Sequence, residues 1–277
     1  MGETAVPTGS QGGTMGWMSP EEIAWDNGGS ACGVPFEAHL SGDIHTAGSI
    51  IFYILSGGRH CFGSVGYKQQ AAISEDRPVF DALADDSIAI DLVARMVRHE
   101  PSKRLTIAQV KLHPMFWSCG ERIEKIRGWK TSWRRGRDLD RRLSNHPGSV
   151  RHILADRGAR GEAEPGWLSA LDTPVVARLT AREDSRYDGR DVLDLIRAIR
   201  NVFEHWFEHT AAANSSTAHV LAVKALTGWD DAEMRRGHAS ADAQSMRAAA
   251  VCRYFLSEAK FGKLLLVFAF PKAWDLG

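Results

Sequence analysis

Several side chains that suit phosphate chemistry lie close together in the second half of the chain. Arg197, Arg200, Asn201 and His205 follow one another within three helical turns, and Tyr187 precedes them. An imidazole can exchange a proton near neutral pH, and a guanidinium can hold two phosphate oxygens at once. Cleavage of RNA by its own 2′-hydroxyl needs a base, an acid and fixed positive charge beside the pentacoordinate phosphate. These residue types therefore suit work on a phosphodiester.

The stretch that carries them has the periodicity of an amphipathic helix. Its apolar residues recur at spacings of three and four, which predicts one buried face. They are Val192, Leu195, Ile196, Ile199, Phe203 and Trp206. Asp191 can cap the first turn, and an α-helix stacks His205 on Asn201 along the opposite face. Taken alone, a polar helix face of this kind is usually no more than solvated.

The order of these residues resembles the core of the kinase-extension nuclease (KEN) domain. That domain occurs in the inositol-requiring unfolded-protein-response sensors and in the oligoadenylate-dependent ribonuclease. The family pattern is a Tyr-x-Gly turn, an Asp-Leu-hydrophobic-Arg-Ala-hydrophobic-Arg-Asn helix and a His. Here Tyr187 and Gly189 match the turn, residues 194–201 match the helix without a gap, and His205 follows. The resemblance implies four catalytic residues: Tyr187, Arg200, Asn201 and His205.

The resemblance also implies a reaction. We expect a metal-independent endoribonuclease that leaves a 2′,3′-cyclic phosphate and a 5′-hydroxyl. His205 would be the general acid and Tyr187 the base, while Arg200 steadies the phosphate and Asn201 positions it. RNA would be the substrate. Family members act as homodimers or higher oligomers, and ATP or ADP in a kinase cleft favours their association.

The first part of the chain resembles the lower half of a protein-kinase C-lobe. Ser19-Pro20-Glu21 stands where that family has Ala-Pro-Glu, and Asp43 heads an apolar stretch to Leu55 that predicts a central helix. Arg104 matches the kinase arginine that pairs with the glutamate, here Glu21. We expect Ser87 to cap a further helix, with Ile88, Leu92, Val93, Met96 and Val97 facing inward.

The ATP-binding parts of a kinase do not precede Gly13 in this sequence. No Gly-rich loop, strand lysine, His-Arg-Asp loop or Asp-Phe-Gly motif is found there, and those parts bind ATP and magnesium. We therefore expect no kinase activity and no cofactor in this chain. ATP, ADP and Mg²⁺ would belong to a full-length family member, and the sequence reads as a truncated product or an incomplete gene model.

These features together predict a mainly α fold in two domains. Residues 1–118 would form the partial kinase-like C-lobe without an N-lobe, and residues 119–277 an all-α KEN-type ribonuclease domain. In the second domain, Ile123 and Ile126 would face inward from a helix, and the stretch from Trp167 to Leu179 would belong to the core. An insertion is expected around residues 211–250.

Composition sets further limits. Lys plus Arg and Asp plus Glu are equal at 34 each, so no global charge indicates nucleic-acid binding. Positive charge is local instead, with Arg134, Arg135 and Arg137 in a basic run. The four cysteines form no Cys-x-x-Cys pair, which fits a reducing compartment. The longest apolar run is too short to span a bilayer. The expected location is cytoplasmic, on the cytosolic face of the endoplasmic reticulum if the chain belongs to a full-length sensor.

Two departures from the family pattern leave an alternative open. Val202 and Phe203 stand where the family commonly carries lysines, and Glu204 stands where a histidine often precedes the catalytic one. Missing cations would weaken RNA binding, and Glu204 would partly neutralise Arg200 one turn back. The alternative is a catalytically silent fragment that binds RNA or protein as a regulatory module.

Overall fold

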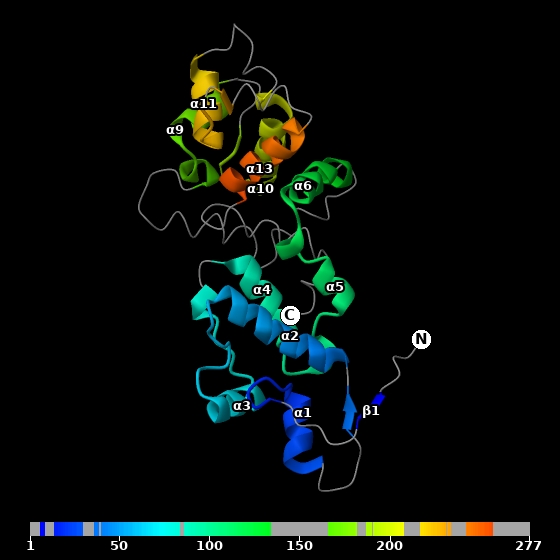
Figure 1. The fold of residues 1–277 in the computed structure, drawn as a ribbon. Helices are drawn as coiled ribbons and strands as arrows, with labels where there is room; N and C mark the ends of the chain where they lie inside the picture. The colour runs from blue at the N-terminus through cyan, green and yellow to red at the C-terminus, as the bar shows by residue number, and fades with distance from the viewer. Residues whose placement is uncertain are drawn as a thin grey trace. The chain divides into compact units, whose positions relative to one another are not determined.

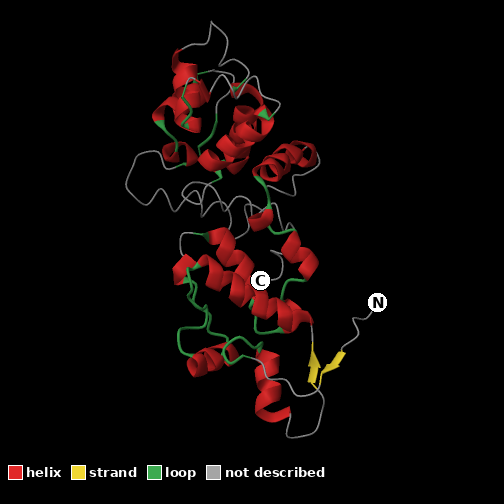
Figure 2. Cartoon of the chain, viewed as in Figure 1, coloured by secondary structure: helices red, strands yellow, loops and turns green. Residues whose placement is uncertain are grey.

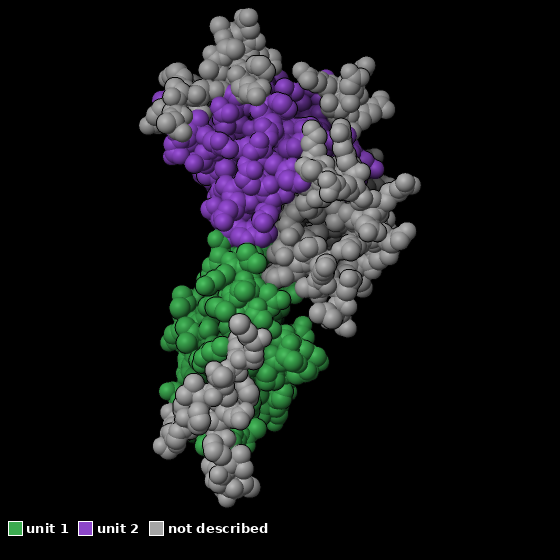
Figure 3. Space-filling model, turned by 90° about the vertical axis from the view of Figure 1, so that its right-hand side faces the viewer, with its two compact units in different colours: residues 1–116 green, residues 117–277 purple. Residues whose placement is uncertain are grey.

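The structure is a computed structural model that divides into two compact units, residues 1–116 and 117–277 (Figure 3). It describes residues 6–8, 14–29, 36–38, 40–83, 86–133, 166–181, 187–189, 191–207, 217–230, 232–233 and 242–256. Residues 134–165, which hold most of the basic run, lie outside these ranges. None of the helices within them is long and apolar enough to cross a membrane.

Helices dominate both units (Figures 1 and 2), so the predicted mainly α fold is confirmed. Strands in the described ranges are limited to β1 (Val6–Thr8) and β2 (Phe36–Ala38), which pair antiparallel with Val6 opposite Ala38. The helices of the first unit are α1 (Pro20–Ala24), α2 (Leu40–Leu55), α3 (Gly66–Ser74), α4 (Ser87–Met96) and α5 (Ile107–Lys111). Shorter turns are η1 (Trp25–Gly29), η3 (Asp81–Leu83), η4 (Pro101–Lys103) and η5 (Pro114–Phe116).

The core of the first unit is built on the crossing of α2 and α4. A Cβ atom on Gly48 would lie 2.7 Å from Met96 Cβ and 2.9 Å from Val97 Cγ1, so the two helices approach closely only because residue 48 is glycine. The five residues of α4 and its end that were predicted to face inward are all buried. The cap is different from the prediction. Asp86, not Ser87, accepts a hydrogen bond from Ala89 N–H at 2.9 Å, because the helix already includes Ser87.

The sequence predicted that the central helix α2 would be buried on every side. This prediction is wrong. It begins at Leu40, and its buried side includes Ile44, His45 and Phe52. Its other side exposes Ile50, Tyr53, Ile54 and Leu55. In the described part of the first unit, neighbouring elements therefore cover only one side of this helix.

The structure brings Glu21 and Arg104 together in a two-pronged ion pair. Arg104 Nη1 and Nη2 donate to the two carboxylate oxygens of Glu21 at 2.6 and 2.7 Å. The same guanidinium donates to the backbone carbonyl of Ser41 in the first turn of α2 and to those of Arg98 and His99 after α4, so it joins these two segments to α1. Burial raises the pKa of Glu21, but hydrogen bonds and the charge of Arg104 outweigh burial and lower it.

Asp43 lies exposed in the first turn of α2.

The second unit is a set of helices packed around α10 and the turn that follows it. Its elements are α6 (Cys119–Trp133), η7 (Trp167–Ala170), α9 (Thr173–Thr180), α10 (Val192–Asn201), η9 (Val202–Trp206), α11 (Thr217–Thr227) and α13 (Ala243–Phe255). α11 packs along α9, and α13 packs against α6. Ile123, Ile126 and Trp167 are buried as predicted. Within the expected insertion around 211–250, α11 and the start of α13 contribute buried side chains to this unit.

The ion pair yields a first prediction. Glu21→Ala leaves the Arg104 guanidinium buried without its carboxylate, and Arg104→Ala leaves three carbonyl groups without their donor. Each change should lower the free energy of unfolding by about 3–5 kcal/mol, and the double variant should lose no more than the worse single one. Urea unfolding of the four proteins measures this. Lys103→Ala is the control, because the Lys103–Glu100 pair is exposed to solvent and should contribute little to stability. Additive losses would contradict the coupling.

His45 yields a second prediction. Its ring is 1 % exposed, and neither ring nitrogen has a hydrogen-bond partner among the described residues. Burial, followed by the charge of Arg104, lowers the pKa of His45 to about 3. The unfolded chain therefore takes up a proton below its ordinary value of 6.5 while the folded unit does not, so stability falls as the pH drops from 6.5 toward 3.

His45→Phe should remove this pH dependence and raise the free energy of unfolding by roughly 1–3 kcal/mol, because two unpaired buried nitrogens disappear. Urea unfolding at neutral and mildly acidic pH would compare the two proteins. The exposed His99 supplies the control variant, His99→Phe, which should leave the pH dependence as it is. A His45→Phe protein with the same pH dependence as the unmodified chain would refute the assignment.

Candidate active site

The helix that carries the candidate residues is α10. The Asp191 carboxylate accepts a hydrogen bond from Leu193 N–H at 2.8 Å, as expected of an N-cap. Leu195, Ile196 and Ile199 are buried on its inner face. Arg197 and Arg200 lie on the partly exposed face. The predicted start and cap of this helix and the burial of these three residues are therefore confirmed, while the side chain of Val192 lies outside the described residues.

The α-helical winding stops at Asn201 and is replaced by a π-helical turn, η9. Hydrogen bonds in such a turn span five residues where an α-helix spans four. The turn buries Val202, Phe203 and Trp206 and leaves His205 exposed. The predicted α-helical stacking of His205 on Asn201 is therefore wrong in detail, because His205 stands on a wider turn. Turns of this type recur at functional sites.

Packing explains why Val202, Phe203 and Glu204 depart from the family pattern. Val202 is fully buried and Phe203 is nearly so, so the two positions where lysines were expected face the core of the unit. The sequence predicted that Glu204 would pair with Arg200, but it pairs with Arg127 instead. Its Oε1 accepts a hydrogen bond from Arg127 Nε of α6 at 2.6 Å, because the turn directs Glu204 toward that helix.

Three of the four candidate catalytic residues form one hydrogen-bonded chain. Arg200 Nε and Nη2 donate to Asn201 Oδ1 at 3.2 and 2.7 Å, and Asn201 Nδ2 donates to the Tyr187 hydroxyl oxygen at 3.0 Å. Since a guanidinium only donates, the carbonyl end of the amide must face Arg200 and the amino end must face Tyr187. Asn201 thus offers a donor to the Tyr187 oxygen. His205 follows on the next turn, with its ring exposed.

Trp167 braces the turn that carries Tyr187. Its indole Nε1–H is shared between the carbonyl oxygens of Asp188 and Asp191, both at 3.0 Å. Its backbone N–H donates to Gly189 O at 2.8 Å, and its ring meets the edge of Tyr187 with centroids 5.9 Å apart. The sequence indicated Trp167 only as core. A buried indole N–H usually needs an acceptor, and this rule could have indicated that Trp167 supports a nearby backbone turn.

The guanidinium of Arg197 lies over the ring of Tyr187. The Arg197 guanidinium is 4.6 Å from the centre of the Tyr187 ring, and its Nη2 lies 3.2 Å from Asp194 Oδ1. Arg197 and Arg200 therefore bring positive charge to the ring and to the amide beside it. The arrangement can hold an anion near the Tyr187 oxygen.

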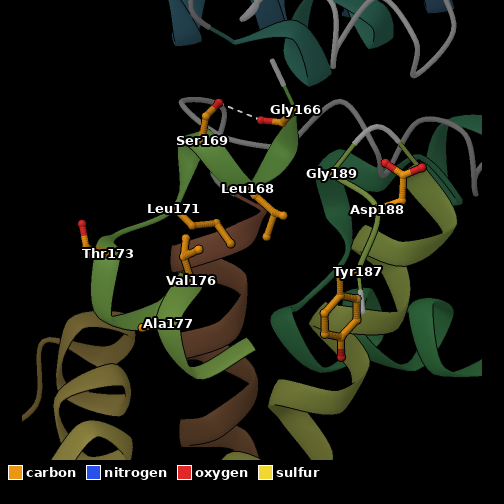
Figure 4. A pocket seen from close by; sticks show the side chains of 10 residues that line it. All are labelled: Gly166, Leu168, Ser169, Leu171, Thr173, Val176, Ala177, Tyr187, Asp188 and Gly189. Carbon is orange, nitrogen blue, oxygen red and sulfur yellow. Dashed lines mark hydrogen bonds between the residues drawn. The ribbon is translucent and has the colours of Figure 1, made fainter. Parts of the chain in front are cut away.

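A pocket of about 610 Å³ opens beside Tyr187 (Figure 4). Leu168, Leu171, Val176 and Ala177 give it apolar walls, while Ser169, Thr173 and Asp188 bring polar groups to it. Figure 4 shows that one wall comes from η7 and α9 and the other from the turn of Tyr187. Such a mixture of apolar walls and a few polar groups is typical of sites for small organic groups.

The described residues contain no cluster of three or more His, Cys, Asp or Glu that could hold a metal ion. Their cysteines, Cys61, Cys119 and Cys252, are free thiols. Burial raises the pKa of the Cys61 thiol to about 11. The ionisable side chains of the candidate site are therefore those of Tyr187, Arg197, Arg200 and His205.

Comparison with known proteins finds a matching family model and several relatives. The family model described as Ribonuclease 2-5A matches residues 139–222, which include the turn, α10 and η9. Human serine/threonine-protein kinase/endoribonuclease IRE2 is 31 % identical over 201 residues, covering 71 % of this chain and 20 % of the human protein. The Caenorhabditis elegans kinase/endoribonuclease ire-1 is also 31 % identical, over 71 % of this chain and 18 % of its own length.

A third relative is the sensor for unfolded proteins in the ER, ire1, of Schizosaccharomyces pombe. It is 26 % identical over 70 % of this chain and 18 % of its own length. The chain thus spans about a fifth of the length of these curated relatives. On the combined strength of the matched nuclease region and these relatives, the chain is a member of the kinase/endoribonuclease family whose nuclease region is of the Ribonuclease 2-5A, or KEN, type.

Proposed function

We propose that the second unit is an endoribonuclease that cleaves RNA through attack by the 2′-hydroxyl, without a metal ion. The observation that carries this proposal is the chain of hydrogen bonds from Arg200 through Asn201 to Tyr187. It aligns a fixed positive charge, an amide donor and a phenol oxygen on one side of the helix. His205 follows on the adjoining turn, where solvent and substrate can reach it.

Each residue then has one task. In its phenolate form, Tyr187 accepts the proton of the 2′-hydroxyl, whose oxygen attacks phosphorus. The bond to the 5′-oxygen breaks, and His205 gives that oxygen a proton, which leaves a 2′,3′-cyclic phosphate and a 5′-hydroxyl. Arg200 uses N–H groups from both Nε and Nη2 for Asn201 among the described residues, and its guanidinium has five, so others can serve the phosphate oxygens.

The pocket beside Tyr187 supports RNA as the substrate. A nucleoside joined to a phosphate at Arg200 needs apolar surface for its base, and the pocket walls supply it. We further propose that a homodimer or higher oligomer is the active form and that residues 1–118 serve as a partial kinase-like scaffold. A folded protein that binds RNA as a dimer but never cuts it would favour the regulatory-module alternative.

Site substitutions give the third prediction. His205→Ala should lower single-turnover RNA cleavage by roughly 10²–10⁴-fold, the usual contribution of a positioned proton donor. Arg200→Ala should lower it by roughly 10²–10³-fold through lost stabilisation of the phosphate. The exposed His99 and Arg253 give control variants, His99→Ala and Arg253→Ala, which should cleave normally. Melting temperatures of all four variants show whether each remains folded.

The assay for this prediction should fuse the chain to a dimeric tag and include EDTA. Cleavage should persist in EDTA, because protein groups supply both the proton donor and the positive charge. Cleavage that EDTA abolishes, or that does not depend on His205, would come from another nuclease and would defeat the proposal.

The pocket gives the fourth prediction. Ala177→Phe places a bulky ring in the pocket from an exposed position of α9, so the unit should still fold. It should weaken binding of an uncleavable, 2′-deoxy-substituted RNA by roughly 1–3 kcal/mol, the worth of one well-held base. Thr180→Phe is the matched control, because Thr180 is exposed on the same helix and is not part of the pocket wall. Fluorescence anisotropy measures both, and equal affinities would refute a base in this pocket.

A further inference from the structure

His219 of α11 lies buried against the turn that carries His205. Its ring is 4 % exposed and makes two hydrogen bonds. Arg178 Nε of α9 lies 2.9 Å from His219 Nδ1, and His219 Nε2 lies 2.9 Å from the backbone oxygen of Trp206. The imidazole therefore bridges α9 and the last residue of η9.

The partners determine which nitrogen carries the proton. A guanidinium can only donate, so Nδ1 must accept, and a backbone carbonyl can only accept, so Nε2 must donate. The imidazole is therefore neutral, with its proton on Nε2. Arg178 also packs over the Trp206 ring, 5.7 Å from its centre, and the His219 ring lies 6.3 Å from it. Both the carbonyl and the side chain of Trp206 are thus held by the same two residues.

We infer that His219 is a positioning residue, which fixes the π-helical turn and so the placement of His205. Trp206 follows His205 directly, and its carbonyl belongs to the end of a helix, where carbonyl groups need partners from outside the helix. His205 lies on the exposed side of the turn, and Trp206 lies on its buried side. The catalytic part of this inference rests on the proposed function, in which His205 is the general acid.

Three variants test the inference. His219→Leu keeps the bulk and removes both hydrogen bonds. It should lower kcat by about 10²-fold, the cost of a small misplacement of a catalytic group, while KM for RNA stays unchanged. His219→Gln keeps one acceptor and one donor and should recover most of the lost rate. Val223→Ala is the control, because truncating this buried side chain of α11 lowers the melting temperature while both hydrogen bonds of His219 remain.

Hydrogen–deuterium exchange of residues 202–207 provides a readout that does not depend on cleavage. Exchange should become faster in His219→Leu, return toward normal in His219→Gln and stay normal in Val223→Ala. If the unmodified chain does not cleave RNA but the exchange follows this pattern, the positioning role stands and the ribonuclease proposal fails. A His219→Leu protein with normal cleavage or normal exchange would overturn the inference. So would an equal loss of kcat in Val223→Ala, or no recovery in His219→Gln.

Discussion

The indole N–H of Trp167 holds the turn on which the candidate site depends. One buried donor is shared by the carbonyls of Asp188 and Asp191, and buried donors of this kind are almost always satisfied. The two carbonyls lie on either side of Gly189, so the shared donor fixes the conformation between Tyr187 and the cap of α10. The direction of that helix and the place of the phenol ring are set together. Asn201 can then reach Tyr187 across the turn.

A second brace acts at the other end of the same helix. His219 hydrogen-bonds to the carbonyl of Trp206, and Arg178 hydrogen-bonds to His219. Trp167 hydrogen-bonds to the residues before Val192. Segments distant in sequence thus supply the supporting contacts of a candidate site whose side chains lie in α10 and in the turns on either side of it. Such support is what keeps reactive side chains in one geometry.

The parts of this structure that sequence could predict are local or come from the family resemblance. The apolar period and Asp191 sufficed for α10, because three- and four-residue spacing and a short carboxylate act within one helix. The pairing of Glu21 with Arg104 followed from the kinase-like motifs. The π-helical turn could not be predicted, since Val202 and Phe203 fit an α-helix equally well. The turn packs against α13, and side chains of α6 and α11 hydrogen-bond to it, so its surroundings come from distant segments. The contact between Glu204 and Arg127 depends on the same distant packing.

The backbones of Gly166 and Gly189 touch without any side chain between them. A Cβ atom at residue 166 would lie 2.5 Å from the carbonyl oxygen of Gly189. One added methyl group would separate the Trp167 segment from the Tyr187 turn while the buried helix faces remained packed. In a gene, a single nucleotide changes a glycine codon to an alanine codon. A duplicated copy of this gene can thus lose the proposed active site in one step, with its helices intact.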